Sequence, residues 1–287
     1  MRNVLTIDLE DYYQVTAFHG GARSGEWDGK ESHVQQNAEK VLGILSSVQC
    51  RATFFSLGWV AEKFPHIIRQ IAECGHEIAC HSNRHRLVYS MTPAEFEEDT
   101  RRAKELLEDA GGVAVRGYRA PSFSITRESK WAFEVLAQLG FTYDSSIFPV
   151  KHMDYGIPDA PRRPFQIVTP SGTITEFPLP TLSLGSARSP IAGGAYFRLL
   201  PYHYTRWGIR YLNAVEQQAV CVYLHPWEID PAQPRMNGGF TARARQYFGL
   251  RGTEAKLRRL LKDFEFEPLR DLIERLGATQ LIQHELT

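Results

Sequence analysis

Long apolar runs and a surplus of charge are both absent from this 287-residue chain. No run approaches the roughly 20 apolar residues that a helix needs to cross a bilayer, so we expect no transmembrane segment. Lys and Arg number 33 and Asp and Glu also number 33, which gives a formal charge of zero. A neutral chain gives no reason to expect nucleic acid or an anionic membrane as a partner.

Cysteine is scarce, and the N-terminus shows no export signal. The four cysteines lack the Cys-x-x-Cys spacing, which favours buried thiols in a reducing compartment over a disulfide framework. The chain begins with a strand-like run and not with an apolar segment followed by a cleavage site. These absences predict that the protein is cytoplasmic, either free or bound peripherally to the inner membrane.

The residues that are present indicate an α/β fold. The chain is 43% hydrophobic and 23% charged, a balance typical of a domain with a sizeable core. Apolar, β-branched runs alternate with helical patterns, as in a parallel sheet whose strands are joined by helices. The predicted strands are 4–9, 52–57, 76–80, 113–119, 141–143, 165–169, 173–177 and 219–224. The predicted helices include 32–47, 58–64, 65–74, 93–109, 199–217, 253–264 and 269–276.

The alternation of strands and helices stops between residues 148 and 198. Proline and glycine are frequent there, and only short strand-like runs occur. Long irregular segments in compact domains are usually functional, so we expect this insertion to border the mouth of a site. We predict one domain over residues 1–287. Residues 1–147 supply the first strands, and 148–287 supply the insertion, the last barrel strand and the C-terminal helices.

Two histidines and a cluster of acids follow two of the predicted strands. His81 and His85 are four residues apart, and on a helical turn both rings would leave the same face. Two imidazoles at this spacing can bind one metal ion. Asp8, Glu10 and Asp11 end the first strand and would reach the same rim if the strands are parallel. The two groups together predict a metal site with one carboxylate ligand.

Three further strands end in polar residues that suit catalysis. Arg119 would keep a carboxylate base ionised through charge-assisted hydrogen bonds. His225 would protonate a leaving group. Asp144 would fix the tautomer of that histidine, as the third member of a catalytic triad does. With a metal that polarises a carbonyl and activates water, these residues are typical of amide hydrolysis.

Five short segments occur in an order that is known from one protein family. They are residues 6–11, 81–85, 119–121, 144–146 and 224–225. The set resembles the polysaccharide deacetylases with a NodB-like domain, carbohydrate esterase family 4, which remove N-acetyl groups from amino sugars. The C-terminal part, with residues 190–198 and 225–230, resembles the subgroup associated with exosortase-type exopolysaccharide loci. The resemblance implies a distorted (β/α) barrel of seven or eight strands.

The resemblance also implies a role for each site residue. Asp8 matches the catalytic base and Arg119 the residue that orients it. His225 matches the general acid, and Asp144 lies in the segment associated with that acid. The two histidines of the 81–85 segment match the metal ligands.

The third metal ligand stays open at this point. Many family members carry a second aspartate where this chain has Leu9, so the ligand is either Glu10 or Asp11. Glu10 points the same way as Asp8 if the strand stays extended. Asp11 reaches the metal better if the chain turns there, and we favour Asp11.

We therefore predict a metal-dependent hydrolase that removes N-acetyl groups from an amino-sugar polysaccharide or its lipid-linked precursor, in exopolysaccharide biosynthesis. The cofactor is a divalent metal. Zinc is favoured, and Co²⁺, Ni²⁺ or Fe²⁺ fit the same ligands. The alternatives are a metal-free or other-amide hydrolase on the same barrel, similar to allantoinase, and a glycan-binding protein without turnover. The expected partner is an N-acetylated glycan, and the sequence predicts no particular oligomeric state.

Overall fold

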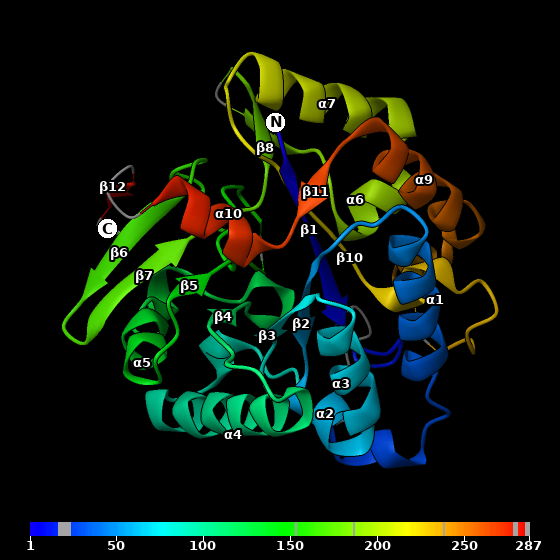
Figure 1. The fold of residues 1–287 in the computed structure, drawn as a ribbon, viewed down its shortest axis with the longest axis horizontal. Helices are drawn as coiled ribbons and strands as arrows, with labels where there is room; N and C mark the ends of the chain where they lie inside the picture. Colours follow the sequence, from blue (N-terminus) through cyan, green and yellow to red (C-terminus); the bar gives the residue numbers. More distant parts are fainter. Residues whose placement is uncertain (17–23, 153, 186, 238, 278–280, 285–287) are drawn as a thin grey trace.

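A parallel sheet wrapped by helices forms the centre of the molecule (Figure 1). The computed structural model describes residues 1–16, 24–152, 154–185, 187–237, 239–277 and 281–284. The strands of the main sheet are β1 (Asn3–Leu9), β2 (Thr53–Ser56), β3 (Glu77–Cys80), β4 (Gly117–Tyr118), β5 (Tyr143–Asp144), β6 (Phe165–Thr169), β7 (Gly172–Glu176), β10 (Cys221–Leu224), β11 (Phe266–Glu267) and β12 (Ile282–Gln283). A separate hairpin consists of β8 (Thr181–Leu184) and β9 (Ala187–Pro190).

The sheet confirms the predicted α/β class. Its order is β10-β1-β2-β3-β4-β5-β7-β6-β12, with β11 paired to β1. Within the described residues, the seven strands from β10 to β7 all pair in parallel, and β6 returns antiparallel to β7. β1 lies between two parallel neighbours and all seven of its residues are buried, which explains its apolar sequence. Parallel pairing brings the carboxyl ends of these strands to one rim.

Helices cover the sheet, and most begin where the sequence predicts. They are α1 (Val34–Ser46), α2 (Gly58–Lys63), α3 (Pro65–Glu73), α4 (Pro93–Gly111), α5 (Ala132–Gln138), α6 (Gly194–Leu199), α7 (Tyr202–Ala214), α8 (Phe240–Tyr247), α9 (Leu250–Asp263) and α10 (Leu269–Leu276). Short 3-10 helices are η1 (Ser24–Gly29), η2 (Val88–Ser90), η3 (Pro121–Phe123), η4 (Arg127–Ser129) and η5 (Pro226–Ile229). At the start of α4, the Thr92 side chain and Glu95 form a reciprocal capping box.

The predicted helix 199–217 is shorter in the structure, where α7 spans Tyr202–Ala214 and a separate helix, α6, ends at Leu199 in the segment predicted to be irregular. Leu200 has an extended backbone with ψ of 150° and Pro201 follows it, so α6 ends before the proline and α7 begins after it. A residue that precedes proline is excluded from the helical region by a clash with the proline ring. The break lets α6 turn towards the rim of the sheet while α7 runs along the opposite end of the molecule.

A buried carboxylate joins three elements below the rim. Glu77 accepts hydrogen bonds from Thr53 Oγ1 at 2.6 Å, from Tyr143 OH at 2.8 Å and from the Arg270 backbone N–H at 3.0 Å. Burial raises the pKa of Glu77, and these hydrogen bonds offset part of the rise. The Tyr143 ring needs Gly117 beneath it, because a Cβ at that position would lie 1.9 Å from the ring. The contacts fix β2, β5 and α10 relative to one another.

We expect Tyr143→Phe to lower the free energy of unfolding by about 1–2 kcal/mol, because it removes a donor from the buried Glu77. Gly117→Ala should cost about 1–3 kcal/mol, since its methyl group overlaps the Tyr143 ring. Equilibrium unfolding in urea measures both values. Tyr211→Phe, at an exposed tyrosine of α7, is the matched control and should change stability by less than about 0.5 kcal/mol. Unchanged stability of Tyr143→Phe would contradict the role given to Glu77.

Candidate active site

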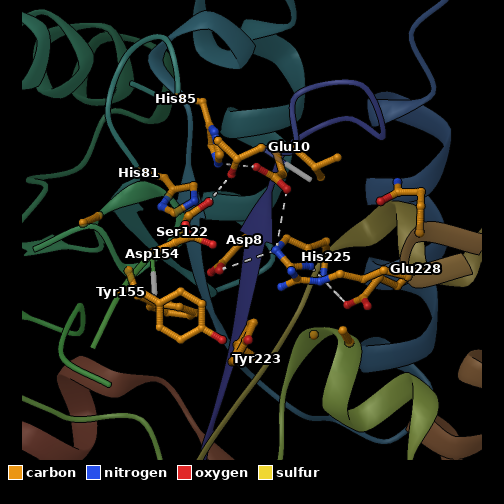
Figure 2. A pocket seen from close by; sticks show the side chains of 18 of the residues that line it. Asp8, Glu10, His81, His85, Ser122, Asp154, Tyr155, Tyr223, His225 and Glu228 are labelled. Carbon is orange, nitrogen blue, oxygen red and sulfur yellow. Dashed lines mark hydrogen bonds and ion pairs between the residues drawn. The ribbon is translucent and has the colours of Figure 1, made fainter. Parts of the chain in front are cut away.

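A cavity of about 260 Å³ opens at the rim where the parallel strands end. Residues that follow β1, β3 and β10 line its base, and aromatic side chains from the segments after β5 and β9 form its walls. The labelled side chains of Figure 2 converge on this space from these elements. The cavity therefore holds the strand-end residues that the sequence singles out, with the exceptions described below.

Glu10, His81 and His85 form a group that can hold a metal ion. One ligand atom from each residue lies within 4.8 Å of the other two, and all three residues are buried. Oε2 of Glu10 lies 2.9 Å from Nε2 of His85, yet the contact lacks hydrogen-bond geometry. In Figure 2 the Glu10 carboxylate points towards both imidazoles. A buried oxygen placed against a ring nitrogen without a hydrogen bond is the arrangement expected of two ligands that share a cation.

The protonation of His81 also suits metal binding. Its Nδ1 donates to the backbone carbonyl of Arg119 at 2.8 Å, which leaves the lone pair on Nε2. Burial and the neighbouring His85 lower the pKa of His81 to about 3, so the ring is neutral. Neutral imidazole is the form that binds metals. The donor set therefore fits a divalent ion.

The two histidines meet in a loop and not on the helical turn that their spacing suggests. Ser82 and His85 have positive φ values of 68° and 51°, which are uncommon for residues other than glycine. The Ser82 hydroxyl accepts from the His85 backbone N–H at 2.9 Å, and Asp99 of α4 accepts from the Asn83 N–H at 2.8 Å. Strained backbone of this kind persists where the surroundings fix it, and it is concentrated at functional sites.

Asp11, which the sequence favours as the third ligand, lies elsewhere. Its Oδ2 accepts from the Ser32 hydroxyl at 2.7 Å and from the backbone N–H groups of His33 and Val34 at 2.9 and 3.2 Å. Asp11 thus caps the start of α1, where a carboxylate stabilises the helix. The preference for Asp11 does not agree with this geometry. The side chain of Glu10 points to the same side as Asp8, and we carry Glu10 forward as the candidate ligand.

Arg119 and Asp8 form a buried ion pair, as expected for the base and its orienting group. Arg119 Nη1 donates to Asp8 Oδ1 and to Thr6 Oγ1, each at 2.7 Å. Its Nε and Nη2 donate to the carbonyl and hydroxyl oxygens of Ser145, each at 3.0 Å. Burial opposes the charge, but Asp8 and then Cys221 raise the pKa of Arg119 above its usual value. Asp8 is therefore held by one oxygen, and its Oδ2 faces His225 across the cavity.

His225 lies on the other side of the cavity, as Figure 2 shows. Its Nε2 is 3.9 Å from Asp8 Oδ2 and 3.6 Å from Glu10 Oε1. Trp227 stacks on the imidazole, with ring centroids 5.1 Å apart. Burial disfavours the imidazolium, yet Glu10, Glu228 and Asp8 together raise the pKa of His225 to about 9. These carboxylates favour the imidazolium, which is the form that a general acid needs.

Glu228 contacts the second nitrogen of His225, and the sequence analysis missed it. Glu228 Oε2 lies 3.1 Å from His225 Nδ1 and accepts from the His225 backbone N–H at the same distance. The sequence around His225 could have revealed this contact. Pro226 opens a helical turn, and an acid three residues after the cap residue is typical of a capping box. Arg198 donates from Nε to Glu228 Oε1 at 3.0 Å, and both side chains are buried.

Asp144, expected beside His225, does not reach it. Its carboxylate accepts from the Ser146 backbone N–H at 2.8 Å and the Ser146 hydroxyl at 2.7 Å. It also pairs with Glu176, and burial raises the pKa of both carboxyl groups, most strongly that of Glu176. The partners of this carboxylate are thus Ser146 and Glu176, whereas Glu228 is the carboxylate that contacts His225 Nδ1. The expected role of Asp144 passes to Glu228.

Comparison with known proteins agrees with this architecture. Residues 27–143 match the family model described as polysaccharide deacetylase, and residues 145–274 match a domain of unknown function (DUF3473). The peptidoglycan deacetylase of Helicobacter pylori is 30% identical over 116 residues, which are 40% of this chain and 38% of that protein. A peptidoglycan-N-acetylglucosamine deacetylase of Bacillus cereus is 35% identical over 96 residues, 33% of this chain and 35% of that protein. Both matches span less than two fifths of the relatives' own lengths.

Two solved structures share the fold over nearly the whole chain. A Mycobacterium smegmatis protein assigned to the polysaccharide deacetylases aligns with a TM-score of 0.63 and 21% identity, covering 100% of this chain and 94% of that one. PuuE allantoinase aligns with a TM-score of 0.60 and 16% identity, covering 96% and 90%. At these identities the likeness shows a common fold. The family match covers residues 27–143, so this part of the chain is similar to the polysaccharide deacetylases, and the fold of the whole chain agrees with that match.

Proposed function

We propose that this chain is a metal-dependent deacetylase that removes N-acetyl groups from an amino-sugar polysaccharide or its lipid-linked precursor. One observation carries the proposal: a metal-binding group, Asp8 and His225 line a single cavity, and Arg119 holds Asp8 from behind. Hydrolysis of an unactivated amide needs an electrophile, a base and an acid at the same place. The names of the two matched bacterial relatives support an N-acetylated amino-sugar polymer as the substrate class.

Glu10, His81 and His85 would hold the metal ion. Two imidazoles and one carboxylate are a donor set that suits zinc and leaves coordination positions free. A divalent ion bound there would polarise the acetyl carbonyl and make water a better nucleophile. Co²⁺, Ni²⁺ and Fe²⁺ accept the same ligands.

The two remaining groups move protons on opposite sides of the acetamide. Asp8 is tied to Arg119 through Oδ1, and its Oδ2 takes the proton from the attacking water. His225 donates the proton on Nε2 to the departing amine, while Glu228 accepts from Nδ1 and holds the ring. Tyr155 and Trp227 border the same space, and aromatic rings of this kind suit the apolar faces of sugars.

We further propose that the deacetylase acts in exopolysaccharide biosynthesis. This part of the proposal rests on the resemblance of residues 190–198 and 225–230 to the exopolysaccharide-associated subgroup. These segments contain Arg198, Trp227 and Glu228, which lie behind or beside the proposed acid. The subgroup resemblance therefore falls on residues that contribute to the site and not on a remote surface.

Asp8→Asn should lower acetate release from an N-acetylated glucosamine oligomer by about 10²–10⁴-fold, the usual contribution of a general base. Acetate released by the metal-loaded protein is the measurement. Asp159→Asn, an exposed aspartate, is the control and should leave the rate unchanged. Wild-type activity in Asp8→Asn would contradict the base assignment. Glycan binding without acetate release, or hydrolysis of a ureide in its place, would favour the two alternative functions.

The choice of third ligand can be tested on metal content. Glu10→Gln should weaken metal retention by at least about tenfold, because it removes a charged ligand. Asp11→Asn should retain the metal and lose about 1 kcal/mol of stability through the weakened cap of α1. Metal content after dialysis against a mild chelator and urea unfolding give the two readouts. The reverse pattern would restore Asp11 as the ligand.

The pH profile tests which carboxylate serves His225. Glu228 helps to raise the pKa of His225, so Glu228→Gln should lower that pKa. The acid form is then lost earlier as the pH rises, and the alkaline limb of kcat/KM should move to lower pH. Asp144→Asn is the matched variant and should leave the limb in place. A shift in Asp144→Asn without one in Glu228→Gln would reinstate Asp144.

A further inference from the structure

Helix α7 has one buried face and one face that is largely exposed. Tyr202, Thr205, Gly208, Ile209 and Leu212 are buried against the body of the protein. Figure 1 shows α7 along one end of the molecule, next to the N-terminus. Asn213 near its end exchanges hydrogen bonds with Asn3 at the start of β1. The helix therefore lies at the opposite end of the strands from the catalytic rim.

An aromatic row runs along the exposed face, and its first member, Tyr204, is half-buried with its hydroxyl bonded to Ser189 and Pro190. The ring centroids of Tyr204 and Trp207 are 6.2 Å apart, and those of Trp207 and Tyr211 are 6.0 Å apart. Trp207 is 50% exposed, Tyr211 37% and Val215, one turn further on, 64%. Single exposed apolar residues are ordinary, but a contiguous row at helical spacing marks a contact surface.

A basic row lies beside the aromatic row. His203, Arg206 and Arg210 lie on α7, which contains no acidic residue. The adjoining end of α9 adds Arg259, whose guanidinium lies 4.9 Å from the Tyr202 ring, and the exposed Lys262. Together α7 and α9 carry seven Lys and Arg against two acidic residues, in a chain whose formal charge is zero. Arg206 pairs with Asp263 at 2.9 Å, and Arg210, Arg259 and Lys262 remain exposed beside that pair.

We infer that this face of α7 binds the surface of an anionic lipid bilayer. Trp and Tyr prefer the boundary between headgroups and acyl chains, because one part of each ring is apolar and its tip is polar. Arginines beside such a row attract anionic headgroups. A helix with both features lies in the plane of the interface and does not cross the membrane. No described helix is long and apolar enough to span a bilayer.

The composition of the face distinguishes the bilayer from other occupants. A second copy of this chain would bring the same excess of positive charge against itself. A neutral glycan would stack on the rings but would leave the basic row without a partner. The anionic bilayer is complementary to both rows. Contact at this end also leaves the catalytic cavity uncovered, so the inference does not depend on the proposed reaction.

Flotation of the full chain with lipid vesicles tests the inference. We expect binding to vesicles that contain phosphatidylglycerol, none to phosphatidylcholine alone, and weaker binding as salt rises. Arg210→Glu and the double variant Trp207→Ala/Tyr211→Ala should each reduce partitioning roughly tenfold or more. Arg116→Glu and Phe240→Ala, at an exposed arginine and an exposed phenylalanine elsewhere, are the controls and should bind like the wild type.

Three results would overturn the inference. The first is a wild-type protein that does not float with phosphatidylglycerol vesicles. The second is unchanged partitioning of the Arg210 and Trp207/Tyr211 variants. The third is a dimer, measured by light scattering, that the same substitutions dissociate, because the face would then join two copies. Circular dichroism confirms the fold of each variant, and acetate release from a soluble oligomer should stay unchanged in all of them.

Discussion

The buried guanidinium of Arg119 is the group on which the rest of the site depends. A fully buried charge is tolerated only with close partners, and Asp8, Thr6 and Ser145 supply them from β1 and the end of β5. The same residue fixes the metal side, because its backbone carbonyl accepts from His81 Nδ1. One residue therefore orients Asp8, the proposed base, and fixes the tautomer of His81, a proposed metal ligand.

The acid side of the cavity is built by the segment that matches the domain of unknown function. Arg198 donates to Glu228 and also to the backbone carbonyls of Phe248 and Arg245, which ties α6, η5 and the end of α8 together. Glu228 in turn holds His225. The site thus contains two buried arginine–carboxylate pairs, Arg119–Asp8 and Arg198–Glu228, and His225 lies between their carboxylates.

The strand ends could be predicted from the sequence because they follow from local patterns. Apolar runs bounded by polar residues mark parallel strands, and Asp8, His81 and His225 each end or follow one of them. The errors concern what the side chains contact and how the backbone turns beyond the strand ends. Asp11 is held by Ser32, and two positive φ values replace the helical turn around His85. The carboxylate of Asp144 is held by Ser146, a contact that the strand-end pattern does not reveal. The contact of Glu228 with His225, by contrast, could have been predicted from the capping-box spacing of the two residues.

The formal net charge of zero does not describe how charge is distributed over the surface of the protein. The charges that surround the cavity are paired, so they contribute strong local fields and almost no net charge. An excess of Lys and Arg over acidic residues lies on α7 and α9, although Arg206 and Arg258 there are paired with Asp263 and Glu254. If the end of the molecule that carries α7 rests on a bilayer, the cavity faces the aqueous phase. This orientation suits a polymer that extends from the membrane better than a sugar held at the headgroups, and so favours the polysaccharide over its lipid-linked precursor as the substrate.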